Sequence, residues 1–245
     1  MALTLSALTT LAAGSARAEE TRRWRTSCTF SAAAPNAAAA GHCPGENGSL
    51  YRVPALYRDG LKLTPVSLQI YYENKSLAAG ELVAFPVGYH YVLDDRVTRH
   101  WIWSCGDMTQ FGDKPPATCA SGDIQVRSEF PNCWDGILDA DGDAAKHVIW
   151  ANGLGVPGRG ERIADPSHNS CPDGYPKPLP MLRLTAHYLT GSRVGDLTVS
   201  SGSVESWRAE FVNGWDQTVL QGLIDKCLNH PDVTCPHFTG TMPAP

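Results

Sequence analysis

The sequence lacks the motifs of several common enzyme classes. It contains no His-Glu-x-x-His, Gly-x-Ser-x-Gly or Gly-x-x-x-x-Gly-Lys segment. These patterns supply the zinc ligands of metalloproteases, the nucleophile of serine hydrolases and the phosphate-binding loop of nucleotide enzymes. Those three mechanisms are therefore left without their usual residues.

Clustered positive charge and long apolar runs are also missing. The formal net charge is -5, and the densest basic group is Arg22, Arg23 and Arg25. Nucleic-acid binding needs a basic footprint, and a membrane-surface patch needs more clustered cations than these three. No segment has the ~18 uninterrupted apolar residues of a membrane-spanning helix. We therefore expect no nucleic-acid partner and no membrane span. We also expect the protein to be a monomer.

The eight cysteines include no Cys-x-x-Cys pair. Zinc sites usually draw thiolates from close pairs, so a disulfide framework fits this spacing better, and we expect no metal ion and no cofactor. Short loop closure favours Cys105 with Cys119 and Cys227 with Cys235. Each of these bonds would add about 2 to 3 kcal/mol by restricting the unfolded chain. The other pairings stay open.

The first residues resemble an export signal. Ala2–Ala13 is rich in apolar and small residues, and Ala16-Arg17-Ala18 has the small-x-small form of a cleavage site, although the usual basic start is missing. We interpret residues 1–18 as a signal-like leader, 19–42 as a poorly structured N-terminal segment and 43–240 as one β-rich domain. Together with disulfides, this predicts a secreted or extracellular protein, with the periplasm as an alternative compartment.

Short strand-like runs separated by Gly and Pro turns dominate the rest of the chain. They lie at residues 66–72, 101–105, 124–130, 148–150, 182–188 and 197–200. In residues 124–130, apolar Ile124 and Val126 alternate with polar Gln125, Arg127 and Glu129, which is the pattern of a half-buried strand. The sequence therefore predicts a mainly β fold, as a β-sandwich or a jelly-roll-like architecture.

One amphipathic helix is predicted at about residues 216–228. Asp216 can cap its start, and Val219, Leu220, Leu223 and Ile224 follow at the spacing of a single apolar face. Pro231 prevents its continuation. We expect this C-terminal helix to pack against the sheets, held by a disulfide from Cys227.

Asp135 is the first candidate for chemistry, since Trp134 precedes it and His147 follows nearby in the sequence. A carboxylate and a histidine can act as an acid/base pair or as ligands for a hard cation. The alternative is a loop corner around a disulfide, which the general use of Asp and Gly in turns favours.

A second candidate cluster spans residues 207–216 and mixes aromatic with polar side chains. Trp215 could stack on a sugar ring while Arg208, Glu210 and Asn213 bond its hydroxyl groups. In the alternative interpretation the aromatics are core residues and Asp216 is only the helix cap, as is usual for aromatic residues.

Several motifs resemble those of one family when taken together and in this order. They are Tyr51-Arg52-Val53-Pro54-Ala55-Leu56, Ile70-Tyr71-Tyr72, Trp103-Ser104-Cys105, Phe130-Pro131-Asn132-Cys133-Trp134-Asp135-Gly136 leading to His147, Cys171-Pro172 through Leu179-Pro180, and Phe211 to Asp216 followed by Cys227. The chain resembles the secreted domain-of-unknown-function family numbered nineteen ninety-six, of fungi and bacteria. The resemblance covers about residues 43 to 235 and implies no established activity.

The resemblance also implies a set of histidines from which this chain departs. Family members carry a His-Leu-His segment near the N-terminus, which this sequence lacks. Tyr175 stands where the family has a histidine after the Cys-Pro element, and Arg208-Ala209-Glu210 stands where it has His-x-Asp. If those histidines form one site, this member has altered or lost it.

Two hypotheses of function follow. In the first, an exported protein acts on or binds an extracellular polysaccharide or cell-wall ligand, with Asp135, His147 and Glu210 as catalytic acid/base groups. The residues expected to contact that ligand are Trp134, Tyr175, Arg208, Asn213, Trp215 and Asp216. In the second, the chain is a non-catalytic surface-associated or metal-binding domain whose site has degenerated in this member. The sequence leaves open whether the protein is an enzyme.

Overall fold

The computed structural model describes most of the chain after residue 46 and three strands before it. The described residues are 23–27, 29–31, 39–42, 47–74, 82–94, 100–140, 142–151, 170–230, 235 and 237–239. The signal-like leader at residues 1–18, Cys28 and Cys43 lie outside these ranges.

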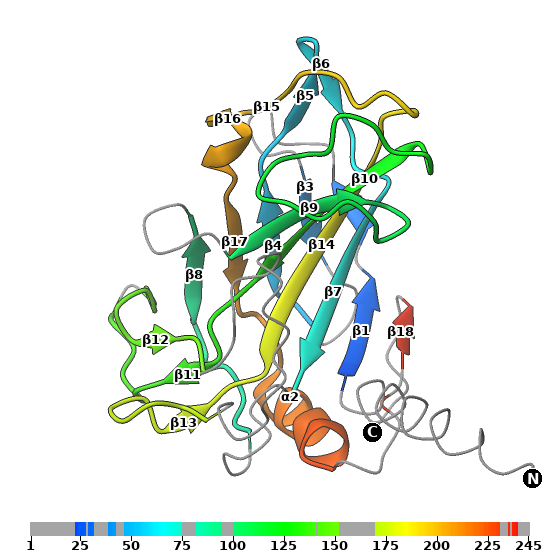
Figure 1. Cartoon of the computed structure of the whole chain (residues 1–245). Helices are drawn as coiled ribbons and strands as arrows, with labels where there is room; N and C mark the ends of the chain where they lie inside the picture. Colours follow the sequence, from blue (N-terminus) through cyan, green and yellow to red (C-terminus); the bar gives the residue numbers. More distant parts are fainter. Residues whose placement is uncertain are drawn as a thin grey trace, which may run out of the picture.

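The largest sheet, called the main sheet below, has six strands (Figure 1). In spatial order they are β18 (His237–Thr239), β1 (Arg23–Ser27), β7 (Ser67–Glu73), β14 (Met181–Leu189), β10 (Asp123–Glu129) and β9 (Trp101–Cys105). The β1–β18 pair is parallel, and the other pairs are antiparallel. Antiparallel sheets commonly pack one face on the core and leave the other open to solvent or ligands.

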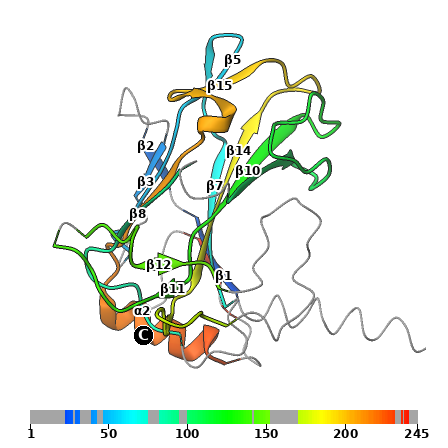
Figure 2. The ribbon, with the colours of Figure 1, turned by 60° about the vertical axis from the view of Figure 1, so that its left-hand side comes forward.

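A five-stranded antiparallel sheet, called the second sheet, lies opposite the main sheet. Its order is β2 (Thr29–Ser31), β3 (Ala39–His42), β4 (Leu50–Val53), β17 (Ala209–Val212) and β8 (His90–Leu93). Figure 2 shows the two sheets as separate layers, with β2, β3 and β8 in one layer and β7, β10 and β14 in the other.

Two small antiparallel sheets extend this pair of layers. One has the order β16 (Gly202–Ser203), β15 (Leu197–Val199), β5 (Leu56–Arg58) and β6 (Leu61–Leu63), and it is followed by the 3-10 turn η2 (Val204–Ser206). The other has the order β12 (Val148–Ile149), β11 (Cys133–Trp134) and β13 (Lys177–Pro178). Figure 1 places these two sheets at opposite ends of the molecule.

The core lies between the facing sides of the main and second sheets. Tyr72 and Leu184 of the main sheet and Tyr51 and Phe211 of the second sheet are all completely buried. The Tyr51 and Tyr72 hydroxyls are 2.6 Å apart, so a hydrogen bond joins the two sheets inside the core. Each such buried aromatic contributes about 1.5 to 3 kcal/mol through removal of apolar surface from water. The predicted β-sandwich is confirmed.

Strand β10 shows the alternation that the sequence predicts, with one difference. Ile124, Val126 and Ser128 face the core and are at most 1% exposed. Gln125 belongs to the opposite, polar face, yet it is only 4% exposed. Its amide donates to the carbonyl of Cys105 at the start of the β9–β10 connection. The outer face of the main sheet is therefore partly enclosed and is not a flat surface.

The predicted C-terminal helix is present at one end of the sandwich. It consists of α2 (Gln217–Leu223) and continues as one π-helical segment, η3 (Ile224–Leu228). The Asp216 carboxylate accepts a hydrogen bond of 3.0 Å from the Val219 N–H and so caps the helix start. Leu220 and Ile224 are completely buried, as expected for the apolar face of the helix.

Disulfide bonds connect Cys105 with Cys119 and Cys227 with Cys235, as the sequence predicts. A third bond joins Cys133 to Cys171, a pairing that the sequence left open.

The described residues within 19–42 form strands that their composition does not predict. Strands β1, β2 and β3 form here, and β1 pairs with β7 so that Arg25 lies opposite Tyr71. Ala and Gly contribute little to an apolar pattern, whereas strand pairing depends on main-chain hydrogen bonds. A pattern of side chains therefore gave no signal for these strands.

Candidate ligand-binding face

The outer face of the second sheet carries a cluster of charged side chains. Burial alternates along β17: Ala209 and Phe211 are buried, whereas Glu210 and Val212 are partly exposed on the outer side of the sheet. The register places Glu210 opposite Arg52 of β4. Arg52 is itself exposed between two buried residues. The period of two residues in each strand thus puts these side chains on one face.

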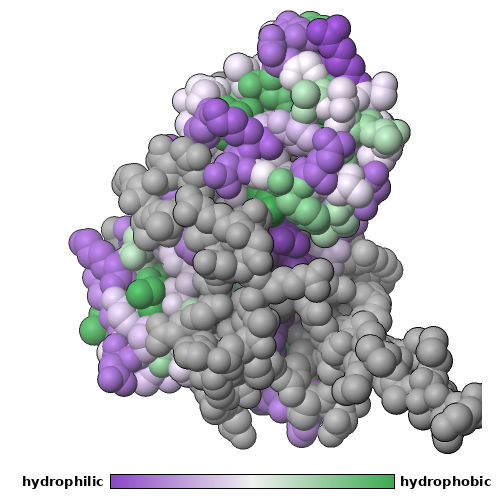
Figure 3. Space-filling view, in the orientation of Figure 1, coloured by the Kyte–Doolittle hydropathy of each residue, from purple (hydrophilic) through white to green (hydrophobic). Residues whose placement is uncertain are grey.

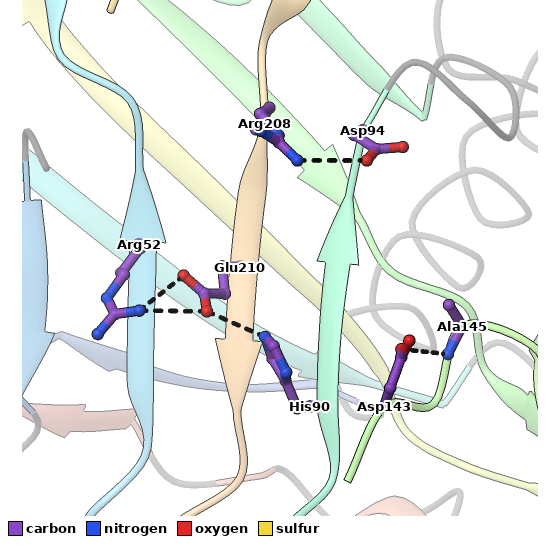
Figure 4. Close-up of polar contacts among 7 residues, drawn as sticks. All are labelled: Arg52, His90, Asp94, Asp143, Ala145, Arg208 and Glu210. Carbon is purple, nitrogen blue, oxygen red and sulfur yellow. Dashed lines mark hydrogen bonds and ion pairs between the residues drawn. The ribbon is translucent and has the colours of Figure 1, made fainter. Parts of the chain in front are cut away.

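Glu210 is held by side chains from both neighbouring strands (Figure 4). The Nη1 atom of Arg52 lies 3.0 Å and 3.2 Å from its two carboxylate oxygens. The Nε2 atom of His90 in β8 lies 2.9 Å from Oε1. Glu210 keeps 22% of its side chain exposed. Cross-strand pairs of opposite charge stabilise a sheet modestly, so this arrangement chiefly fixes where the carboxylate points.

Arg208 and Asp94 extend the cluster along the same face (Figure 4). Arg208 Nη2 lies 3.6 Å from Asp94 Oδ2, with the arginine side chain 54% exposed and the aspartate only 4% exposed. A buried carboxylate is costly unless a cation or hydrogen-bond donor compensates it, and Arg208 supplies a cation. The guanidinium group itself still reaches solvent.

Asp135 and His147 are brought together in a neighbouring loop. Their main chains bond where Asp135 N–H donates to the His147 carbonyl at 3.1 Å. The His147 Nδ1 atom is 2.8 Å from Asp135 Oδ2, and its Nε2 atom is 3.3 Å from Asp139 Oδ1. The Cys133–Cys171 disulfide fixes the strand that leads into Asp135.

These contacts shift the pKa values of both groups. The hydrogen bond that His147 donates to Asp135 raises the pKa of His147 above its ordinary value; burial opposes this with a smaller effect, and the contact with Asp139 raises the pKa further. Burial alone would raise the pKa of Asp135, but the hydrogen bonds from His147 and the Ile137 N–H lower it. The pair therefore favours an imidazolium held between two carboxylates. A general base needs an unprotonated ring nitrogen facing its substrate, which this state does not offer.

The loop that carries Asp135 and His147 lies directly beside the charged face, by which we mean the outer side of the second sheet with Arg52, His90, Asp94, Arg208 and Glu210. The carboxylates of Asp135 and Glu210 nevertheless have separate partners. The His90 N–H donates to the Gly142 carbonyl at 2.8 Å, and the Ala144 N–H donates to the His90 carbonyl at 2.9 Å. Strand β8 is thus the link between the two groups. Asp135 is bonded to His147, whereas Glu210 is bonded to Arg52 and His90.

Three other residues expected to contact a ligand have their polar groups engaged in the fold. Asn213 is 6% exposed and donates to the Phe85 and Pro86 carbonyls at 3.0 Å and 2.9 Å. Trp215 is 5% exposed, and its indole N–H donates to the Tyr72 hydroxyl at 2.9 Å. Asp216 caps α2.

Trp134 and Tyr175 are partly exposed. The Trp134 indole N–H donates to the Ile137 carbonyl at 2.6 Å, and the Lys177 ammonium lies 4.8 Å from the centre of its ring. Tyr175 belongs to a turn in which its N–H donates to the Pro172 carbonyl at 3.0 Å. Trp134 therefore offers a ring that a cation already covers in part.

Sequence reasoning missed Arg52, His90 and Asp94 as members of the charged face. Arg52 could have been found, because it lies between Tyr51 and Val53 in a run with the period of a strand. His90 and Asp94 carry no such signal, since nothing in the sequence indicates that β8 pairs with β17. The contacts come from strands far apart in the chain.

Within the described ranges, no three His, Cys, Asp or Glu side chains are grouped so that they could hold a metal ion. The helices formed by these residues include none that is long and apolar enough to cross a bilayer.

Comparison of the chain with curated proteins and with solved structures found no significant match. A family model does match, and it is described as a domain of unknown function, DUF1996. The match runs over residues 21–215, which include every strand of the sandwich from β1 to β17. The chain therefore belongs to this family.

Proposed function

We propose that this protein is exported and binds an extracellular polysaccharide on the charged outer face of the second sheet, without cleaving it. The observation that carries the proposal is the fixed Glu210 carboxylate between Arg52 and His90 on an exposed strand surface. The disulfides support an oxidising compartment, in which such bonds persist.

The face offers both donors and acceptors to sugar hydroxyl groups. Arg52 uses only Nη1 to contact Glu210, and its Nη2 and Nε atoms have no hydrogen-bond partner among the described residues. Arg208, 54% exposed, adds a second guanidinium. Sugars are recognised by a few precisely placed polar groups beside apolar contact area, which Val92 and Val212 provide on this face.

Binding is better supported than hydrolysis. Glycosidases usually place two carboxyl groups about 5 to 10 Å apart across the scissile bond, one of them protonated. Both oxygens of Glu210 are engaged by Arg52, and Oε1 also contacts His90, so neither oxygen is left free to face a scissile bond. Asp135 is paired with His147 in a different loop. Glu210 thus fits the role of a hydrogen-bond acceptor.

Acid/base chemistry at Asp135 and His147 is the second candidate. The 2.8 Å contact and the raised pKa of His147 favour an imidazolium, which can donate a proton. In this version, His147→Gln abolishes release of reducing sugar ends from the polysaccharide, and Glu210→Gln reduces it through weaker binding. If the wild type binds the polysaccharide but releases no reducing ends, this second candidate is wrong and the non-catalytic proposal holds.

Loss of a family metal site in this member is the alternative interpretation. The family resemblance implies a histidine where this chain has Arg208, which is paired with Asp94. A guanidinium cannot ligate a metal ion, because it stays protonated in proteins. Arg208 thereby favours recognition of anionic or hydroxyl groups over metal binding.

The test is retention of purified full-length variants on a panel of insoluble cell-wall polysaccharides. We expect Glu210→Gln and Arg52→Gln each to weaken binding to the retained polysaccharide at least tenfold. Lys62→Gln is the matched control, since it removes an exposed charge from β6 in a different sheet. Equal retention of all four proteins, or no retention of the wild type on any polysaccharide, would refute the proposal.

A further inference from the structure

A pocket lies on the outer face of the main sheet, on the other side of the sandwich from the charged face. Its volume is about 300 Å3, and its floor is formed by strands β7, β9, β10 and β14. The register aligns Gln69 with Thr185 and Gln125 with His187 across this floor. Figure 3 is drawn in the orientation that places the main sheet in front, and it shows hydrophobic and hydrophilic residues intermixed on the upper part of this side.

Two guanidinium groups give the pocket unused hydrogen-bond donors. Arg127 contacts Glu129 through Nε at 3.4 Å, and its two Nη groups have no partner among the described residues. Arg183 uses Nη2 for a 2.7 Å ion pair with Glu73. The Nε atoms of both arginines and Nε2 of His187 are buried without a hydrogen bond to any described residue. A buried donor without a partner is unfavourable, so acceptors supplied by a ligand would stabilise the pocket.

No Asp or Glu is among the described residues that line the pocket. Glu73 and Glu129 hold the two arginines in place from outside the lining. Burial lowers the pKa of His187, so its ring is neutral at neutral pH. The side chains that face a ligand therefore include guanidinium donors and no carboxylate, and guanidinium geometry matches a carboxylate through parallel N–H bonds.

An apolar rim completes the pocket. Phe111 and Met108 are 48% and 49% exposed on the β9–β10 connection, which the Cys105–Cys119 disulfide closes. Met108 and Gln110 of this connection have φ angles of 61° and 51°. Such left-handed conformations are unfavourable for residues with a side chain, and they are concentrated at ligand sites. An exposed aromatic ring beside polar donors suits the mixed surface of a sugar.

We propose that this pocket binds a carboxylate-bearing sugar, a uronic acid, with its carboxylate on Arg127 and its ring against Phe111. A volume of about 300 Å3 accommodates a ligand of one or two sugar rings. The site is independent of the face around Glu210. The uronic acid can be a free sugar or the end residue of an acidic polysaccharide.

The experiment is isothermal titration of the full chain with galacturonic acid, a galacturonic acid trimer, galactose and malate. We expect galacturonic acid to bind at least tenfold more tightly than galactose, which has the same ring without the carboxylate. Malate should bind more weakly than galacturonic acid, because it lacks the ring. Tighter binding of the trimer would assign the site to chain ends, and equal binding would assign it to the free sugar.

Two variants test the assigned contacts. Arg127→Gln should reduce galacturonic acid binding at least tenfold, to the level of galactose, whereas Arg193→Gln, which removes an exposed arginine away from the pocket, should leave it unchanged. If Arg127→Gln does not fold, Phe111→Ala should weaken both sugars and spare malate. Equal affinity for galactose and galacturonic acid, malate binding as tight as that of the uronic acid, or unchanged binding by Arg127→Gln or Phe111→Ala would overturn the proposal.

Discussion

At the scale of single residues, the Asp135–His147–Asp139 contact is the clearest link between geometry and charge. His147 meets a carboxylate at each ring nitrogen, and only the protonated ring can donate to both. The loop from β11 to β12 is thereby closed by an ion pair as well as by main-chain hydrogen bonds.

The stability of this loop should depend on pH in a defined window. The raised pKa of His147 stabilises the fold fully below the ordinary value of 6.5, and this contribution is lost as the pH rises through the raised value. The lowered pKa of Asp135 contributes above its ordinary value of 3.8 and is lost as the pH falls through the lowered one. Amide exchange in residues 133–149 should therefore be slowest near pH 5 and faster at pH 8.5. A His147→Gln variant should lack this change once intrinsic exchange is corrected; an identical profile would contradict the assignment.

His100 should make the whole fold sensitive to acid. It is 6% exposed and stacks on Trp150 with ring centres 3.4 Å apart, and burial lowers its pKa to about 4. Between pH 6.5 and 4 the unfolded chain binds a proton that the folded chain does not. The free energy of unfolding should therefore fall by roughly 3 kcal/mol over that range from this residue. His100→Phe should lose less stability than the wild type between pH 7 and 4.5 in urea unfolding, and parallel losses would show that His100 is not responsible.

At the scale of elements, the Cys133–Cys171 disulfide and strand β8 position the groups beside the charged face. The bond joins β11 to the segment that leads into β13, and these strands are neighbours. Strand β8 then connects the loop at Gly142 and Ala144 to the sheet that carries Glu210.

Removal of the Cys133–Cys171 bond should destabilise the protein. It closes a loop with a sequence separation of 38 residues. The chain-entropy relation for a loop of this length gives about 4 kcal/mol. The Cys133→Ser/Cys171→Ser variant should show this loss in denaturant unfolding and faster amide exchange in residues 133–149. The matched variant Cys105→Ser/Cys119→Ser should instead increase exchange in the β9–β10 connection. Equal exchange changes in both regions for both variants would contradict the local role of the bond.

At the scale of the whole molecule, the sandwich and its helix could be predicted from local patterns. Alternation in residues 124–130, the spacing of Leu220 and Ile224, and the short separation of Cys105 and Cys119 are all visible in the sequence. The charged face could be predicted only in part. Glu210 and Arg208 were identified, but their partners Arg52, His90 and Asp94 come from other strands, and strand order is decided by packing between distant segments.

The pocket on the main sheet could not be predicted for a related reason. Its arginines alternate with core residues as those of any solvent-facing strand do. The β9–β10 connection, with Met108 and Phe111, encloses these arginines. Its path over the sheet depends on Met108 and Gln110, which adopt the left-handed conformation although they are not glycine. No local rule assigns that conformation to methionine or glutamine.

Hydrogen–deuterium exchange with and without a soluble oligosaccharide of the retained polysaccharide tests the central claim most directly. We predict increased protection of β4, β17 and β8, the strands that carry Arg52, Glu210 and His90, and loss of that protection in Glu210→Gln. Protection elsewhere with none on these three strands would contradict the assignment of the second sheet as the binding face.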